Sequence, residues 1–410
     1  MDCKFAVLHK CFSIRFVLIL TLVSSLFSLK TNSFGDEQPS GTECERFAFP
    51  PGRPIAVPVE IFGQIQNLYL STTVGTIILD ESNREKLRRL PIPKNLKIPP
   101  SNAWHEYFPS PEIRVGKANP DPFCDVEPVA VSSKMRDFLP EIGMEGTGFL
   151  GMDYLNTKVL RLCPDEGYAQ IDSVTKMHSE HAERITLREN SVNMLIKLPS
   201  GFESSKIDTV SVNSVTLTTA VFNKLLARRQ IVLTQPKCDA STGPTCLGGV
   251  LEWLEIGPFR VHNVVVYEGK NVSIGLKFLE RFESEFDFPN RIAYFKPGKR
   301  FFLADPRTRS GFGIRRWEGR TFIIGVDPAG IAAQADIRNG DRLLKINETN
   351  TDQLSFFKIR EMHSEPGVEL SLTIERDGET RDVVLQTTNE PDPFPTGPER
   401  TAGQSHLIPL

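Results

Sequence analysis

Three short segments carry the residues of this chain that could do chemistry: two polar turns and one glycine-rich loop. Asp208 stands in Ile207-Asp208-Thr209-Val210, directly after an apolar strand, and its carboxylate is a candidate for acid–base work on a bound water. Ser71 and Thr72 stand in a hydroxyl-rich turn, but a hydroxyl is no base near neutral pH unless another group activates it. Gly311-Phe312-Gly313-Ile314 differs from both, because its glycines let consecutive backbone N–H groups point at one anion.

Short apolar strands separated by turn residues run through most of the chain, whereas long amphipathic helices are scarce. This pattern predicts a mainly β fold. A weak internal repeat predicts two lobes of similar build, each with an apolar strand, a turn rich in serine and threonine, a short helix and an apolar pair before a glycine. The pieces are 68–75, 82–90 and 148–155 in the first copy, and 206–213, 219–228 and 272–279 in the second.

This arrangement resembles the aspartic protease fold, with two retropepsin-like or pepsin-like β lobes at 48–170 and 190–300. In that family each lobe supplies a catalytic Asp-Thr-Gly turn, supported by an apolar-apolar-Gly segment. Phe149-Leu150-Gly151 and Ser273-Ile274-Gly275 resemble the two supports, and 286–298 resembles the closing strand of the second lobe.

The family's chemistry needs two carboxylates, because two that lie close together share one proton and so provide one acid and one base. Here the second lobe keeps Asp208, with Val210 in place of the motif's glycine. In the first lobe Ser71, or Thr72 on a one-residue shift, replaces the partner aspartate. The resemblance therefore implies an aspartic-peptidase-like body that lacks ordinary peptidase activity, and its status as an enzyme stays uncertain.

Two alternatives remain open. A homodimer that brings two Asp208 side chains together, as in single-lobe retropepsins, would be an active aspartic endopeptidase. A structural scaffold of the cell envelope is the other alternative. Asp80 and Asp153 are interpreted as capping or solvated carboxylates, and the sequence contains no Gly-x-Ser-x-Gly elbow of a serine hydrolase.

Residues 308–388 resemble a PDZ domain, an α+β module that binds peptides or protein C-termini. Residues 311–314 resemble its carboxylate-binding loop, 330–337 its first short helix and 338–347 its Gly-Asp turn and buried strand. A helix predicted over 351–363 forms the other wall of the groove. The residues predicted to contact peptide are Gly311, Phe312, Gly313, Ile314, Arg315 as an electrostatic aid, Phe356 and Ile359.

The ends of the chain carry their own signals. Residues 1–33 resemble a signal peptide, because basic residues precede an apolar run that is short for a membrane span, so we expect a secreted or periplasmic protein. The order lobe, lobe, PDZ domain is similar to that of bacterial proteins of this architecture. Residues 389–410 are rich in polar residues and proline, which predicts a disordered tail. Its ending Ile408-Pro409-Leu410 is of a kind that PDZ grooves accept, so the tail is one candidate ligand.

Composition narrows the list of partners. The formal net charge of −3, with both signs mixed along the chain, predicts no nucleic-acid partner. Cys238 and Cys246 flank a turn that suits a local disulfide, whereas the pairing of Cys44, Cys124 and Cys163 stays open. We predict no cofactor and no metal site, since the pair His178 and His181 lies in a polar linker without further ligands nearby.

Overall fold

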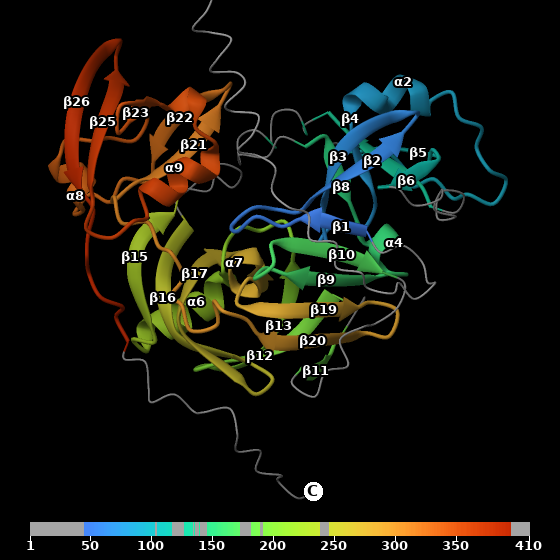
Figure 1. The fold of residues 1–410 in the computed structure, drawn as a ribbon, viewed down its shortest axis with the longest axis horizontal. Helices are drawn as coiled ribbons and strands as arrows, with labels where there is room; N and C mark the ends of the chain where they lie inside the picture. The colour runs from blue at the N-terminus through green and yellow to red at the C-terminus, as the bar shows by residue number, and fades with distance from the viewer. Residues whose placement is uncertain are drawn as a thin grey trace, which may run out of the picture. The chain divides into compact units, whose positions relative to one another are not determined.

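The computed structural model describes residues 45–102, 105–116, 127–133, 135, 139, 146–172, 182–188, 192–237 and 246–394. In this part of the chain strands dominate and the helices are short, which confirms the predicted mainly β fold. The described strands form four sheets (Figure 1). Several predictions fall outside the described residues, namely the signal peptide, the pair His178 and His181, Cys44, Cys124, the bridge from Cys238, and the tail beyond 394.

The first lobe is a sheet of seven strands in the order β5-β7-β4-β8-β3-β2-β6. Its strands are β2 (Ala56–Ile61), β3 (Gln64–Leu70), β4 (Ile78–Asp80), β5 (Glu106–Phe108), β6 (Ile113–Val115), β7 (Val129–Ser132) and β8 (Gly148–Leu150). In β2, Val57, Val59 and Ile61 are buried, as expected for a strand that packs one face on a core. Three short helical segments follow β4 and β8: η1 (Glu81–Asn83), α2 (Arg84–Leu87) and α4 (Met152–Leu155).

The second lobe repeats this plan in a sheet of seven strands, in the order β12-β13-β18-β14-β17-β16-β15. Its elements are β12 (Asn193–Leu198), β13 (Gly201–Asp208), β14 (Val215–Thr218), α6 (Thr219–Ala227), β15 (Ile231–Lys237), β16 (Cys246–Ile256), β17 (Phe259–Gly269), β18 (Ser273–Gly275) and α7 (Leu276–Leu279). β18 lies parallel to β13 and antiparallel to β14, just as β8 lies parallel to β3 and antiparallel to β4. The predicted internal repeat is therefore present in the strand order.

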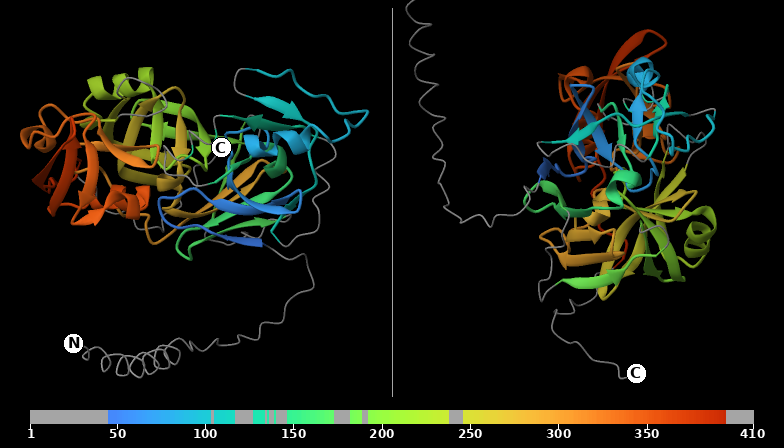
Figure 2. Two further views of the ribbon diagram at one scale, coloured as in Figure 1. Left: turned by 90° about the horizontal axis from the view of Figure 1, so that it is seen from above. Right: turned by 90° about the vertical axis from the view of Figure 1, so that its right-hand side faces the viewer.

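A third sheet joins the two lobes. Its order is β1-β10-β9-β19-β20-β11, and its two central strands, β9 and β19, pair with each other (Figures 1 and 2). The bounds are β1 (Glu45–Ala48), β9 (Val159–Cys163), β10 (Tyr168–Asp172), β11 (Glu183–Thr186), β19 (Phe282–Asp287) and β20 (Ile292–Pro297). The last strands of each predicted lobe thus leave that lobe's own sheet and pair with those of the other. One continuous apolar core runs through all three sheets.

The fourth sheet belongs to the C-terminal region and follows the path β21-β22-β23-β25-β26, with β24 paired to β23. Its elements are β21 (Gly313–Trp317), β22 (Arg320–Ile324), α8 (Ile331–Gln334), β23 (Arg342–Ile346), β24 (Thr349–Asn350), η3 (Thr351–Gln353), α9 (Phe356–Met362), β25 (Glu369–Arg376) and β26 (Glu379–Gln386). Its apolar side chains form a separate cluster, which includes Phe312, Ile323, Ile346, Ile359 and Leu372. This region therefore packs around a core of its own.

Within the described residues no helix has the length and apolar character to cross a membrane. The same residues hold no group of three or more histidine, cysteine or acidic side chains able to bind a metal ion. Cys163 is a buried free thiol in β9.

Candidate functional site

Two glycines mark corresponding points in the two lobes. Gly151 precedes α4 and Gly275 precedes α7, and both have an extended backbone at the helix N-terminus. A Cβ at Gly151 would lie 2.2 Å from the carbonyl oxygen of Thr76, and one at Gly275 would lie 2.3 Å from that of Asn213. Only glycine fits at these distances. The absence of a side chain therefore lets the backbone of the turn at Thr76, or at Asn213, pack directly against the glycine.

The hydrogen bonds of the residues that follow these glycines show which residue of the first-lobe turn corresponds to which residue of the second-lobe turn. The next N–H along the chain donates to the carbonyl of Val74 in the first lobe and to that of Ser211 in the second, each at 2.8 Å. Val74 therefore corresponds to Ser211. Counting back the same three residues from each leads to Ser71 and Asp208, so Ser71 occupies the position equivalent to the aspartate.

The two equivalent side chains are held in the same way. The Ser71 hydroxyl oxygen accepts the N–H of Val74 at 3.2 Å. One oxygen of the Asp208 carboxyl group accepts the N–H groups of Val210 at 3.1 Å and Ser211 at 3.0 Å. The serine thus supplies an acceptor to its turn, as the aspartate does, but it supplies no ionisable group.

Thr72 and Thr209 join the two turns through a reciprocal network. The Thr72 hydroxyl donates to the carbonyl of Ile207 at 2.6 Å, and the Thr209 hydroxyl donates to that of Leu70 at 2.8 Å. Each hydroxyl oxygen also accepts the backbone N–H of the other threonine, at 3.2 and 3.1 Å. Because both threonines are buried and engaged in this way, Thr72 is the counterpart of Thr209 and not of Asp208.

The environment of Asp208 disfavours its charge. Burial raises the pKa of this carboxyl group, while the N–H groups of Ser211 and Val210 and the nearby Lys206 lower it in part. Within the described residues, the groups that shift this pKa include no second carboxylate. Asp208 therefore holds its proton to a higher pH than an ordinary aspartate.

Val210 stands where the resemblance places a glycine. It is not among the residues with positive φ, so its turn does not need glycine's conformational freedom. Its side chain packs against an apolar cluster of the first lobe that includes Tyr69 and Phe149. Apolar packing thus fills part of the space beside Asp208.

The other two carboxylates singled out from the sequence have local partners. Asp80 is buried at the start of η1 and accepts the N–H of Ser82 at 2.9 Å, so it is a helix cap. Burial raises the pKa of Asp153, and a hydrogen bond with the Thr76 side chain lowers it in part.

In the C-terminal region the predicted carboxylate-binding loop lies beside one end of α9. Gly311 has a φ of +78°, which favours glycine. Phe312 stacks on His363, the residue that follows α9, with ring centroids 5.6 Å apart. Among the described strands β21 pairs only with β22, so its other edge can add an extended peptide.

The predicted peptide contacts differ in how accessible their side chains are. The side chains of Phe312 and Ile359 are fully buried, so Phe312 can offer only its backbone N–H to a ligand. Ile314 and Phe356 are buried with a small accessible fraction. The Arg315 guanidinium instead lies over the ring of Trp317, 4.9 Å from its centroid, on the other face of the strand.

Two further groups were not predicted from the sequence. The Nδ1 atom of His363 lies 3.1 Å from the Ser310 hydroxyl, directly before the loop, and burial lowers the pKa of this imidazole to about 3. Arg316 reaches from β21 toward the segment before α9. The strand alternation around Ile314 is the signal that could have identified Arg316.

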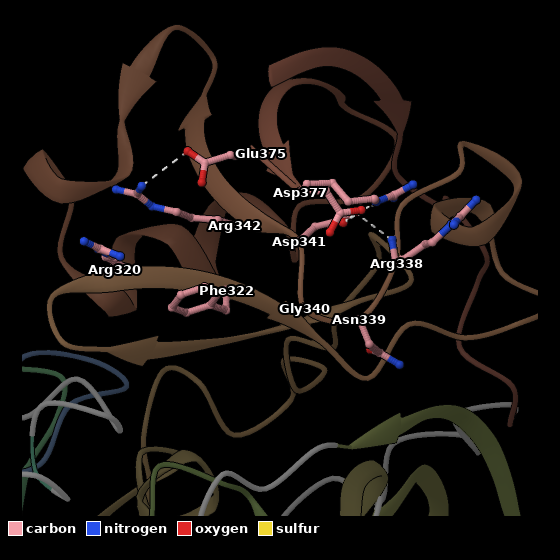
Figure 3. A pocket seen from close by; sticks show the side chains of 10 residues that line it. Arg320, Phe322, Arg338, Asn339, Gly340, Asp341, Arg342, Glu375 and Asp377 are labelled. Carbon is pink, nitrogen blue, oxygen red and sulfur yellow. Dashed lines mark hydrogen bonds and ion pairs between the residues drawn. The ribbon is translucent and has the colours of Figure 1, made fainter. Parts of the chain in front are cut away.

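A cavity of about 460 Å³ lies elsewhere on the sheet of the C-terminal region, lined by β22, β23 and the turn at Gly340 (Figure 3). Two ion pairs form between residues that line it. Arg342 contacts Glu375 at 3.4 Å, and Arg376 contacts Asp341 at 2.7 Å. The cavity is lined by no residue of 311–316 or of α9, so it is separate from the predicted peptide-binding residues.

Comparison with known proteins agrees with this geometry in the C-terminal region. Among solved structures, the fold is similar to that of an aspartic proteinase from Irpex lacteus, with a TM-score of 0.40 and 12% sequence identity. The match covers 64% of this chain and 100% of that one. No curated protein matches the chain. The family model described as PDZ domain matches residues 309–387. Residues 309–387 are therefore a PDZ domain, as the sequence predicted for 308–388.

Proposed function

We propose that this protein binds extended peptides, and protein C-termini in particular, through its PDZ domain. We further propose that its two lobes are an aspartic-protease-like body without ordinary peptidase activity, in a protein that is exported to the periplasm or beyond. The observation that carries the second part is Ser71 at the position equivalent to Asp208.

The chemical reason is the absence of proton sharing. Water attack on a peptide bond requires one group to take a proton while another gives one, and two adjacent carboxyl groups provide both roles. The Ser71 hydroxyl has the Val74 N–H and the Thr73 hydroxyl, 3.4 Å away, as its contacts, and neither is a base. Asp208 with a raised pKa can hold a carbonyl oxygen through its proton, so the lobes can bind a peptide group without cleaving it.

The alternative of an active homodimer conflicts with the contacts of the two turns. Two Asp208 side chains can meet only if the first-lobe turn moves away from the second. That movement breaks the four hydrogen bonds between the Thr72 and Thr209 turns and strains the pairing of β9 with β19. We therefore favour a binding protein over a dimeric peptidase.

Peptide binding is tested with a fluorescein-labelled peptide that ends in leucine, compared as the free acid and as the amide. The free acid should bind at least about tenfold more tightly, since charge-assisted hydrogen bonds to loop N–H groups are lost in the amide. Equal affinity of the two forms would contradict the proposed PDZ function.

Peptidase activity is tested separately with an unfolded protein substrate at acidic pH. Wild type and Asp208→Asn should show the same background, with and without pepstatin. Pepstatin-sensitive cleavage by the wild type that disappears in Asp208→Asn would overturn the proposal for the lobes.

A further inference from the structure

Side chains along β21 alternate between two faces. Ile314 lies opposite the buried Ile323, and Arg316 lies opposite the buried Thr321, so both point toward the core and α9. Arg315 and Trp317 occupy the other face. An arginine on the inner face of a PDZ strand is unexpected, because a hydrophobic position is the usual occupant of that side of a half-buried strand.

The Arg316 side chain crosses to the segment that leads into α9. One of its terminal nitrogens donates to the carbonyl of Thr351 at 3.0 Å and to that of Leu354 at 2.9 Å. The carboxylate-binding loop contacts His363 at the other end of α9. Arg316 therefore links β21 to the segment before α9, at the end of α9 away from the loop.

The charge of Arg316 has no acidic partner among the described residues. One terminal nitrogen makes both of its hydrogen bonds, which go to neutral carbonyls. The other terminal nitrogen has no hydrogen-bond partner among the described residues. A half-buried cation without a counter-charge is costly, and a carboxylate that reaches the second terminal nitrogen forms a charge-assisted hydrogen bond. Arg316 thus offers an incomplete site for an acidic side chain beside β21.

We propose that Arg316 makes the PDZ domain select peptides with Asp or Glu two residues before the C-terminal residue. This inference rests on the proposed peptide-binding function. A peptide that adds antiparallel to β21 turns alternate side chains toward the face of Ile314 and Arg316. With its carboxylate in the Gly311 loop, the last side chain lies near Ile314 and the side chain two positions earlier lies near Arg316.

The test compares two labelled peptides with the same C-terminal leucine, one with Glu and one with Gln two residues before it. The full-length wild type should bind the Glu peptide about tenfold more tightly than the Gln peptide, and added salt should reduce the preference. Arg316→Gln should abolish the preference. Arg315→Gln is the matched control, because it removes the neighbouring charge from the opposite face and should keep the preference.

Three outcomes decide the inference. If wild type binds both free-acid peptides equally but rejects their amides, the role of Arg316 is wrong and the PDZ function stands. If neither free acid binds better than its amide, the proposed function itself fails. Because Arg316→Gln also removes two carbonyl contacts, Arg316→Lys is measured as well, and a folded lysine variant that shows no Glu preference contradicts selection by charge.

Discussion

Asp208 and Ser71 show how one turn can keep its geometry while it loses its chemistry. Both side chains accept a backbone N–H three residues along the chain, so a hydroxyl oxygen replaces a carboxylate oxygen without loss of that contact. What changes is electrostatic. In the part of the chain that the structure describes, no second carboxylate contributes to the pKa of Asp208, and burial makes its ionisation unfavourable.

This raised pKa has a consequence for stability. In the unfolded chain Asp208 ionises near the ordinary pKa of about 3.9, whereas the folded chain holds the proton to a higher pH. The folded state therefore binds more protons between these two pKa values, so stability falls as pH rises through that window, and the full cost is present above the folded pKa.

We expect Asp208→Asn to be more stable than wild type at pH 7, because the amide keeps both backbone hydrogen bonds and carries no charge. The melting temperature should rise on the order of 2 °C for each kcal/mol regained, and the difference should shrink as pH falls toward 4. Thermal unfolding of both proteins across this pH range measures it. A variant that is less stable than wild type at pH 7 would show that the Asp208 charge is stabilised.

The sequence identified Asp208 but left its counterpart open between Ser71 and Thr72. Three consecutive hydroxyl residues give no local reason to prefer one register. The register depends on the N–H after Gly151, which reaches the carbonyl of Val74 from a segment about eighty residues away in the chain. Arg316 was missed for a similar reason, since its contacts with Thr351 and Leu354 exist only after β21 and α9 pack together.

At the scale of elements, helices were predicted well where the chain caps them locally. The helix expected over 219–228 is α6, and Thr218 caps it by accepting the N–H of Val221. The helix expected over 351–363 is instead divided into η3 and α9. Ser355 accepts the N–H of Lys358 and so starts α9 as a new helix after Leu354.

Strand partners were less predictable than strands. The segment 286–298 was expected to close the second lobe, but β19 and β20 form a hairpin that pairs with β9 of the first copy. Alternating apolar residues specify which face of a strand is buried, not which strand lies beside it. The shared sheet is therefore a property of tertiary packing.

We expect Gly151→Ala to destabilise the first lobe by at least about 2 kcal/mol, since its Cβ would overlap the carbonyl of Thr76 in a packed region. Gly75→Ala is the matched control, because a Cβ there meets nothing within 4 Å and its φ is not positive. Urea unfolding of the two variants gives the comparison. Similar losses at both positions would contradict the close approach at Gly151.

At the scale of the whole molecule, the sheet that joins the two lobes is symmetric in its strand order. Each strand on one side of its centre has a counterpart from the other copy of the repeat on the other side. β1, β10 and β9 correspond to β11, β20 and β19, and the pair β9–β19 lies at the centre. The reciprocal contacts of Thr72 and Thr209 follow the same exchange. Two copies of one plan are thus joined at two places.

We expect these two threonines to stabilise the joined lobes as one unit. Thr72→Val should cost about 1 to 3 kcal/mol, because it leaves the carbonyl of Ile207 and the N–H of Thr209 buried without partners. Thr209→Val should cost a similar amount. The double variant should lose less than the sum of the two by at least about 0.5 kcal/mol, since each single change already disrupts the shared network.

Urea unfolding of the four proteins in this cycle measures the coupling, and Thr73→Val is the control because Thr73 is exposed beside the network. Affinity for the C-terminal peptide should stay unchanged throughout, since the PDZ domain packs around a separate apolar cluster. Additive losses would mean that the two turns are stabilised independently. In that case the first-lobe turn could move without cost to the second, and the argument against pairing of two Asp208 side chains across a dimer would lose its energetic basis.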